Sequence, residues 1–333
     1  MARDRGAAMI AALLVLAMQA AAAVATHGDW TVGCDNRRVC EALSRVPEGG
    51  ADADYPLVVL RRDAAPAAPA ALELPIPAGI AAGTRLSLAV DGRTIAELVA
   101  PGGGAGLALP FTGTLAAAIT RGRVLTLADP CRRVRARASL AGLGAALTAI
   151  DTAQGRTGTR TALLRPGRGT ADAVPPAPPL PVIDQPEVTG RPARTLSRAQ
   201  LVRLTDPAQA GCGPALPRSY RLDARHSLLA LEARCGDAAS TWLFVVPEKG
   251  APVAATFDVP AADPPSHRVN GAWDPVGRRV ATLLPAHPGR DCGTLREFAW
   301  DGARFRLARE RVVAECRRTT HHITTWQARV AVH

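Results

Sequence analysis

Lysine is almost absent from this sequence. Of the 40 basic residues, Lys249 alone is a lysine, and all the others are arginines. Aromatic residues make up only 4% of the 333 residues, too few for the stacking platforms that single-stranded nucleic acids need. No known DNA- or RNA-binding motif is present either. We therefore expect no nucleic acid partner, and the net charge of +11 has two interpretations. It reflects the arginine-rich composition of a GC-rich genome, or it attracts anionic partners such as lipopolysaccharide or wall polymers.

The short motifs of common catalytic sites are also missing. The sequence has no C-x-x-C, no H-E-x-x-H and no G-x-S-x-G. His321 and His322 are adjacent, so in a strand they face opposite sides and do not share a metal ion. Asp223 and His226, next to Ser227, resemble an acid–base pair, but such triplets arise often by chance. We predict no catalytic residues, no metal and no cofactor.

The N-terminus has the pattern of a secretory signal peptide over residues 1–25. Arg3 and Arg5 precede an apolar run at 7–24, and small residues stand before a cleavage point at Thr26. The alternative is a retained membrane anchor, because the run is just long enough to span a bilayer. No later segment is long and apolar enough to span. We therefore predict a periplasmic or secreted protein with no membrane span after cleavage.

All seven cysteines follow this leader. Export places them in an oxidising compartment, where disulfides form. Pairing of neighbours along the chain predicts three bridges and leaves Cys131 over, although six cysteines allow many other pairings. The predicted disulfides are Cys34–Cys40, Cys212–Cys235 and Cys292–Cys316. A redox or metal role for Cys34 and Cys40 is the alternative to a structural bridge.

Strand patterns dominate residues 26–170, and we expect a β-sandwich there. Trp30 and Val32 alternate with Thr31 and Gly33 in the first strand, and Asp35-Asn36 supply the turn that follows. Asp91-Gly92, between two alternating segments, gives the strongest hairpin signal. Residues 157–164 are predicted to be the last strand of this domain.

One packed α-helix is predicted over residues 139–154. Ser139 is the candidate N-cap and Gly155 suits the left-handed position after the helix. Asp151 and Gln154 lie on the same arc as the apolar stripe, so both face inward, and Arg156 is a candidate partner. The two interpretations are a structural clamp and a polar ligand pocket formed by Asp151, Gln154 and Arg156. A second candidate site is the arginine cluster after Cys131. Arg133, Arg135 and Arg137 share one strand face, which is either solvated or an anion-binding surface.

A proline-rich stretch at 171–193 predicts an extended interdomain linker. A short helix is expected at 197–204, within a second domain over residues 194–333. Evenly spaced turns in that domain favour a β meander of successive hairpins in one sheet. The predicted fold is therefore mainly β, with two antiparallel domains joined by the linker.

Several phrases resemble an uncharacterised exported bacterial family, the domain of unknown function 1176 family. They lie at Asp29–Asn36, Ser139–Leu147 and Asp151–Leu164, and the resemblance covers nearly the whole mature chain. The first half also resembles invasion-associated locus B proteins, through the W-x-V-x-C hairpin, the V-D-G at 90–92 and the helix start at Ser139. This resemblance implies a secreted or periplasmic β-sandwich linked to host-cell invasion. The chain departs from it at Leu143, where those proteins have phenylalanine, and in having a whole second half.

The function we predict is that of a non-catalytic, disulfide-stabilised exported envelope or binding protein. Its partners would be anionic envelope polymers or another envelope protein. Two alternatives remain open: a periplasmic hydrolase with its site between the domains, and an accessory factor in contact with host cells.

Overall fold

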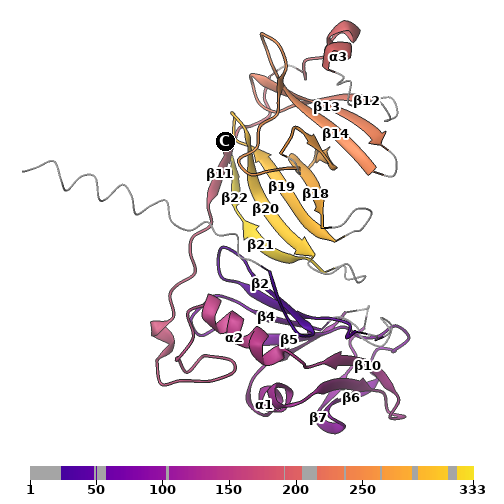
Figure 1. Ribbon diagram of the computed structural model, residues 1–333, viewed down its shortest axis with the longest axis vertical. Coiled ribbons are helices and arrows are strands. Elements are labelled where there is room, and N and C mark those ends of the chain that lie inside the picture. Colours follow the sequence, from indigo (N-terminus) through magenta and orange to yellow (C-terminus); the bar gives the residue numbers. More distant parts are fainter. Residues whose placement is uncertain are drawn as a thin grey trace, which may run out of the picture.

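The computed structural model describes residues 24–48, 50, 58–102, 105–190, 192–204, 216–235, 238–262, 265–286, 292–313 and 321–333. The predicted fold class is confirmed, because the chain is mainly β and its sheets are almost all antiparallel (Figure 1). Among the strands that the structure describes, only β11 and β22 pair in parallel. No helix among the described residues is long and apolar enough to cross a membrane.

Residues 25–139 form two antiparallel sheets. The six-stranded sheet has the order β1 (Ala25–His27), β2 (Trp30–Cys34), β3 (Cys40–Ser44), β4 (Val59–Arg62), β5 (Ala70–Leu74) and β8 (Leu107–Pro110). The four-stranded sheet has the order β10 (Val134–Ser139), β9 (Val124–Ala128), β6 (Arg85–Val90) and β7 (Arg93–Val99). Helices α1 (Gly113–Arg121) and α2 (Leu143–Ala153) pack beside them.

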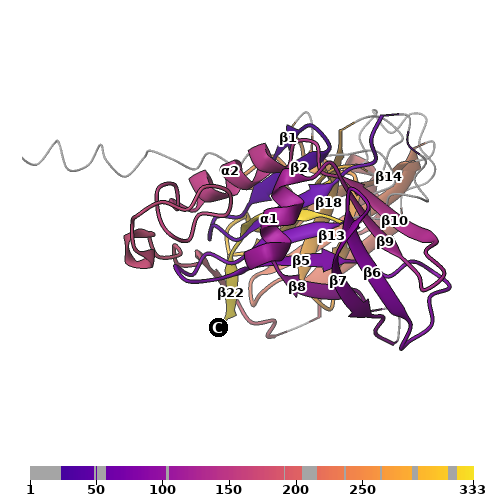
Figure 2. The ribbon, with the colours of Figure 1, turned by 90° about the horizontal axis from the view of Figure 1, so that it is seen from below.

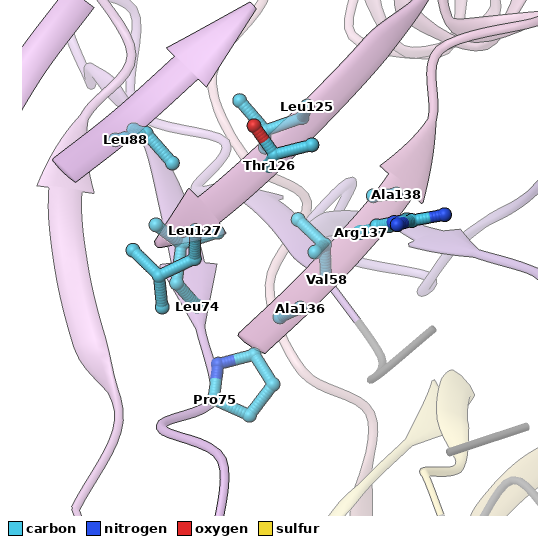
Figure 3. Close-up of a pocket in the computed structure, with 10 residues that line it drawn as sticks. All are labelled: Val58, Leu74, Pro75, Leu88, Leu125, Thr126, Leu127, Ala136, Arg137 and Ala138. Atoms are coloured by element: carbon cyan, nitrogen blue, oxygen red, sulfur yellow. The ribbon is translucent and has the colours of Figure 1, made fainter. Parts of the chain in front are cut away.

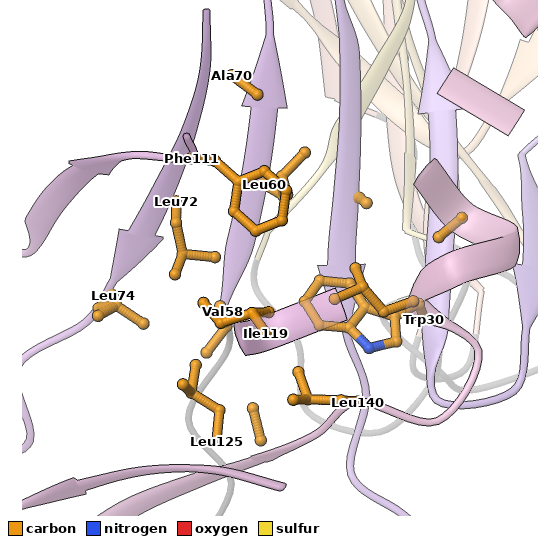
Figure 4. Close-up of a cluster of buried hydrophobic side chains, with 14 of the residues drawn as sticks. Trp30, Val58, Leu60, Ala70, Leu72, Leu74, Phe111, Ile119, Leu125 and Leu140 are labelled. Atoms are coloured by element: carbon orange, nitrogen blue, oxygen red, sulfur yellow. The ribbon is translucent and has the colours of Figure 1, made fainter. Parts of the chain in front are cut away.

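A single apolar core fills the space between these sheets (Figure 4). Trp30 in β2, Leu60 in β4 and Leu72 in β5 reach it from the larger sheet, and Leu88 and Leu125 reach it from the smaller one. Side chains alternate between the two faces of a strand, so the residues that reach the core stand at every second position of each strand. The alternating pattern in the sequence is therefore the pattern of core contacts.

The predicted Asp91-Gly92 hairpin is confirmed. β6 and β7 pair antiparallel on either side of it, with φ of 48° at Asp91 and 81° at Gly92. Asp91 also accepts hydrogen bonds from the backbone N–H groups of Arg123 and Val124, at 3.1 Å and 3.0 Å. The turn therefore fixes the start of β9 as well as its own hairpin.

The predicted helix at 139–154 begins later than expected, at Leu143. Ser139 ends β10, and Gly142 is the N-cap residue, with φ of 90°. A side chain at Gly142 would bring its Cβ to within 1.9 Å of the carbonyl oxygen of His27. Only glycine fits at this position, and its left-handed φ keeps residue 142 out of the helix. The expected left-handed Gly155 after the helix is confirmed, with φ of 68°.

One other expectation for this region was wrong, and one element was missed. Residues 157–164 form turns and not a strand, because Gly158 has φ of 81° and only Thr159 makes an isolated bridge, to Gly169. Helix α1 was not predicted. Its sequence, Gly113–Arg121, is short, and Ile119 alone is fully buried.

The second part of the chain contains two larger sheets, and not the single sheet that we expected. One has the order β12 (Leu216–Arg221), β13 (His226–Cys235), β14 (Ala238–Pro247) and β15 (Val253–Ala254), with β16 (Arg268–Val269) also paired to β14. The other has the order β17 (Gly271–Asp274), β18 (Arg279–Pro285), β19 (Gly293–Trp300), β20 (Phe305–Val313) and β21 (Ile323–Gln327). Leu228 and Leu243 of the first of these sheets share a core with Phe298, Trp300 and Phe305 of the second sheet. Helix α3 (Arg198–Leu204), close to its predicted place, lies by the opposite face of β13 and β14.

The proline-rich stretch is more ordered than the poorly packed linker we expected. It contains a 3₁₀ turn at Ala171–Ala173 and the strand β11 (Val182–Gln185), which pairs in parallel with β22 (Arg329–Val332). Ile183 of β11 is buried against Ala299 and Ala308, on β19 and β20. The pair therefore attaches both the linker and the last strand to the second part of the chain.

Residues 24 and 25, which we expected to belong to the leader, take part in the fold. Ala25 begins β1 and pairs with Val32, and Val24 packs against the cluster of Leu43, Val59 and Ile323. The rest of the predicted signal peptide lies outside the described residues.

Candidate functional site

The hairpin loop between β2 and β3 is closed by the disulfide Cys34–Cys40, as predicted, and Cys40 is fully buried. The carboxylate of Asp35 accepts hydrogen bonds from the N–H groups of Arg37 and Val39, both at 2.8 Å. Asp35 is itself buried, so this Asx-type turn is held from inside by its own carboxylate. The disulfide and the carboxylate of Asp35 thus both close the loop.

This loop joins the first part of the chain to the second. Asn36 donates from Nδ2 to the carbonyl oxygen of Gln327 and accepts the Gln327 N–H at Oδ1, both at 2.9 Å. The side chain of Gln327 donates to Asp35. Gly33 makes room for the contact, because a Cβ there would lie 2.6 Å from Ile323. β21 therefore lies close to β2, as Figure 1 also shows.

A second link between the two parts lies beside this loop. The carboxylate of Glu41 on β3 contacts Nε2 of His321 at 3.1 Å and Nη1 of Arg61 at 3.0 Å. Arg61 and His321 are partly open to solvent, so screening keeps the contribution of these contacts to stability small. The polar loop and the Leu43–Val59–Ile323 cluster are thus the main described contacts between the two parts.

The sequence-predicted residues Asp151, Gln154 and Arg156 do come together, and all three are buried, with exposed fractions of 4%, 1% and 0%. They form a polar network with Arg62 of β4, which we call the buried node. Nη1 of Arg62 lies 3.2 Å from Oδ1 of Asp151, and the other oxygen of Asp151 accepts the N–H of Leu163 at 2.7 Å. The node therefore ties the end of α2 to β4 and to the turns that follow the helix.

The remaining polar atoms of the node bond to the backbone. Gln154 accepts from Nε of Arg156 at 2.7 Å and donates to the carbonyl oxygens of Arg38 and Arg62. The guanidinium of Arg156 donates to the carbonyl oxygens of Ala65 and Pro66, at 2.6 Å and 2.5 Å. Because Arg38 lies in the disulfide loop, the node and the loop are parts of one network. This arrangement has the geometry of the clamp and not of an open pocket.

Burial is the main cause of the shifted pKa values of Arg62 and Asp151 in the node. It lowers the pKa of Arg62 to about 10, with repulsion from Arg156 acting in the same direction and Asp151 opposing it. Burial also raises the pKa of Asp151, although the N–H groups of Leu163 and Leu164 and the charge of Arg62 oppose the shift. Both shifts disfavour the ionised pair, so this ion pair costs desolvation and fixes position more than it adds stability.

The predicted arginine cluster lies at the turn between β9 and β10. Arg135 and Arg137 share the outer face of β10, whereas Arg133 belongs to the turn. Arg135 lies 3.5 Å from the carboxylate of Asp129, and Arg133 and Arg137 are exposed. Among the described residues, Arg133 and Arg137 have no ion-pair partner. These side chains are available to an anion in solution.

Asp223 and His226 form a close pair, at 3.0 Å from Nδ1 of the imidazole to the carboxylate. The same carboxylate accepts a hydrogen bond from Nε1 of Trp300 at 2.6 Å. Ser227, which would complete a triad, instead accepts the N–H of Arg194 at 3.0 Å and is fully buried. The pair lacks a free hydroxyl nucleophile in the adjacent residue.

We expect Asp223 to contribute to stability in a way that is lost at acidic pH. Burial alone would raise its pKa, but hydrogen bonds from Trp300, the N–H of Arg225 and His226 outweigh it and lower the pKa. A lowered folded-state pKa stabilises the protein above about pH 4 and is lost as the pH falls through the folded value. We expect Asp223→Asn to destabilise the chain by about 1–3 kcal/mol at pH 7 and by less at pH 3. Urea unfolding at both pH values measures this, and an equal loss at both would contradict it.

The disulfide loop gives a second prediction. A bridge that closes a loop with a sequence separation of 6 is expected to contribute about 2 kcal/mol by restricting the unfolded chain. We expect the double variant Cys34→Ala/Cys40→Ala to lose about that much in urea unfolding. The matched control is Cys131→Ala, because Cys131 is exposed and free and its removal should change nothing measurable. Unchanged stability of the double variant would show that the loop holds without its bridge.

The other predicted disulfides fall partly outside the description. Cys292 is disulfide-bonded, and its partner lies outside the described residues, as do Cys212, Cys316 and the side chain of Cys235. The pairings Cys212–Cys235 and Cys292–Cys316 remain predictions. No cluster of three or more metal-ligating side chains occurs within the described ranges.

Sequence reasoning missed three residues of these sites: Arg62, Asn36 as a long-range contact, and Gln327. Arg62 follows Arg61 at the end of a strand, and an alternating strand places one of the two inward. That signal was available, but the partner of Arg62 lies 89 residues away along the chain. Asn36 and Gln327 lie 291 residues apart and carry no local signal at all.

The comparisons with known proteins concern the chain as a whole. An uncharacterised protein of Escherichia coli strain K12, YpfG, is 27% identical over 326 residues, which cover 89% of this chain and 90% of that protein. The crystal structure of invasion associated protein B from Bartonella henselae matches 40% of this chain and 99% of its own, with 20% identity and a TM-score of 0.32. Residues 24–333 match a family described as a protein of unknown function, DUF1176. The chain therefore belongs to the DUF1176 family.

Proposed function

We propose that this chain is a non-catalytic, exported protein of the cell envelope that acts by binding. The observation that supports this most is the buried node. Its four polar side chains bond to one another and to the backbone. Arg62 bonds to Asp151, Arg156 bonds to Gln154, and Arg156 also donates to the carbonyl oxygens of Ala65 and Pro66. The most deeply buried charged groups of the first part of the chain thus have a structural role.

The disulfide supports the location. A bridge that holds the loop at the contact between β2 and β21 would be reduced in a thiol-rich compartment. The periplasm or the extracellular space keeps it intact, and the predicted signal peptide would deliver the chain there. Anionic envelope polymers and other envelope proteins are the candidate partners.

Fractionation tests this proposal. The full chain would be produced in a bacterial host and its N-terminus determined by mass spectrometry in each fraction. We expect a chain that has lost its N-terminal leader, with a new N-terminus near the start of β1, recovered from the periplasm or the medium. A full-length chain retained inside the cytoplasmic membrane would overturn the proposed location.

A hydrolase is the second candidate, and the Asp223–His226 pair is the observation in its favour. The exported protein would be screened against peptidoglycan and ester substrates, with Asp223→Ala as the test variant and Asp151→Ala as the control for a loss of stability. Turnover that Asp223→Ala abolishes while the protein stays folded would favour the hydrolase. Absence of turnover favours the binding protein.

A further inference from the structure

The outer face of the four-stranded sheet carries a cluster of arginines. Leu88, Leu125 and Ala136 point into the core, so the residues next to them in each strand point outward. These outward residues are small and polar in the middle of the sheet, where Thr126 lies between Arg137 on β10 and Ala89 on β6. Arginines border this small-residue surface.

We call this surface the arginine face and define it by Arg85, Arg132, Arg133, Arg135 and Arg137. Arg85 starts β6, and the register brings it level with the β9–β10 turn that holds Arg132 and Arg133. Arg85, Arg132, Arg133 and Arg137 are exposed, and within the described ranges none of them has an ion-pair partner. Seen from below, β6, β7, β9 and β10 have no helix in front of them (Figure 2).

The carboxylates nearby are already engaged. Asp129 accepts the N–H groups of Cys131 and Arg133, both at 3.0 Å, and pairs with Arg135. Glu97 accepts the hydroxyl of Ser87 at 2.9 Å. The arginine face is therefore strongly positive in sum, with five guanidinium groups against these two carboxylates.

The interior behind the face does not hold a ligand. An apolar pocket behind β9 and β10 is lined by Leu74, Leu127 and Ala136 (Figure 3), and its volume of about 20 Å³ is room for one water molecule. Arg137 borders this pocket through its strand, but its guanidinium points away from the apolar side chains (Figure 3). Binding must take place on the outer surface.

The spacing of the arginines favours a polymer over a small anion. Arg85 lies two strands and about four residues away from Arg137 in the sheet, so strand geometry puts their Cα atoms about 16 Å apart. One carboxylate or phosphate is held by one or two of these side chains and cannot reach all of them. A chain with repeated negative groups engages all of them together, and each contact raises the effective concentration of the next.

The uncharged residues of the arginine face indicate which class of anionic polymer it can bind. The hydroxyls of Ser87, Thr94 and Thr126 lie on it, and they can hydrogen-bond to sugar hydroxyls. Its strands carry no aromatic residue for stacking on bases. Their exposed apolar side chains are the valines Val99, Val124 and Val134, and no Leu, Phe or Trp of the four strands is exposed to enter a membrane. Guanidinium groups bind carboxylates in a bidentate manner.

We infer that the arginine face binds an extended acidic polysaccharide through its carboxylates. This inference rests on the proposed function and names the partner class of that binding protein. The polymer lies across β10, β9 and β6, with its negative groups on Arg85, Arg133 and Arg137 and its hydroxyls on Ser87 and Thr126.

The experiment uses the mature full chain and polygalacturonate, a linear polymer of carboxylated sugars, in a calorimetric or interferometric binding assay. The test variant is Arg85→Ala/Arg133→Ala/Arg137→Ala. The matched control is Arg198→Ala/Arg203→Ala/Arg309→Ala, which removes the same charge from exposed arginines of the second part. We expect the test variant to bind about tenfold more weakly or worse, and the control to stay within about twofold of the parent. We also expect binding to weaken steeply between about 20 mM and about 300 mM salt.

Four outcomes would overturn the inference. They are no binding by the parent protein, an equal loss in both triple variants, binding of monomeric galacturonate or inorganic phosphate as tight as that of the polymer, and preferential binding to vesicles of anionic lipid. If the protein is exported and disulfide-bonded but does not bind the polymer, the polysaccharide inference fails and the proposed function stands. If the protein binds the polymer but is retained in the cytoplasm, the proposed function fails and the binding result stands.

Discussion

Asp151→Ala is expected to destabilise the protein by about 3–5 kcal/mol. The substitution removes the carboxylate that accepts from Arg62 and from the N–H of Leu163, and it leaves Arg62 and Arg156 as two buried cations without a counter-ion. Leaving one member of a buried ion pair alone costs more than the pair itself contributes. Urea unfolding followed by circular dichroism measures the loss.

Two further variants make this prediction specific. Asp151→Asn keeps one oxygen and replaces the other by a donor, so we expect a smaller loss of about 1–3 kcal/mol. Asp172→Asn, an exposed aspartate in the 3₁₀ turn, should stay within about 0.5 kcal/mol of the parent. If Asp151→Ala were as stable as Asp172→Asn, the buried node would not be structural.

The same carboxylate gives the parent protein a characteristic pH dependence. Because burial raises the pKa of Asp151, the folded state holds this proton at a pH where the unfolded chain has released it. Its contribution is therefore most favourable below about pH 4 and is lost as the pH rises through the folded value. This sign is opposite to that of Asp223, so the difference in stability between the parent and Asp151→Asn should shrink as the pH rises from 4.

Trp30→Ala is expected to cost about 3–5 kcal/mol, as truncation of a buried tryptophan does. Trp30 is 1% exposed, lies in the core between the two sheets of the first part and donates from Nε1 to the carbonyl oxygen of Ser139 at 2.9 Å. The variant opens a cavity beside α2 and leaves that carbonyl oxygen unpaired. Thermal and urea unfolding measure the loss.

Trp30→Phe separates the two effects. It keeps a ring in the core but removes the indole donor, so we expect roughly half the loss of the alanine variant or less. Val99→Ala, at an exposed position of β7, is the control and should change little. Equal stability of Trp30→Ala and Val99→Ala would contradict the described core.

Local patterns predicted the parts of the fold that depend on local chemistry. The alternating strands, the Asp91-Gly92 turn and the left-handed Gly155 all follow from side-chain period and backbone preference. The disulfide loop was also predictable, because Asp35-Asn36 favour a turn and bring Cys34 and Cys40 opposite each other in the hairpin. The inward direction of Asp151 and Gln154 followed from helical period.

Long-range contacts decided what the sequence could not predict. Helix α2 begins after Gly142, which has a left-handed φ and lies close to the carbonyl of His27, and no local pattern reports that distance. Arg62 enters the buried node from a strand far along the chain, so the sequence favoured the clamp but left the ligand-pocket interpretation open beside it. In the second part, the even turn spacing was consistent with one sheet. The structure has two sheets instead, and their strands share one core, in which Leu243 of the first sheet packs with Phe298 of the second.

The account depends most on the state of the disulfide loop that joins α2, the proline-rich stretch and β21. Its carbonyl at Arg38 accepts from Gln154, the Arg38 guanidinium donates to Pro175 and Pro176, and Asn36 binds Gln327. The most direct test is alkylation of free thiols in intact cells, followed by peptide mapping of the purified protein. We predict that Cys34 and Cys40 are recovered as one cross-linked peptide from an extracytoplasmic fraction, while Cys131 is alkylated. Recovery of Cys34 and Cys40 as separately alkylated thiols from the protein in its native compartment would contradict the account.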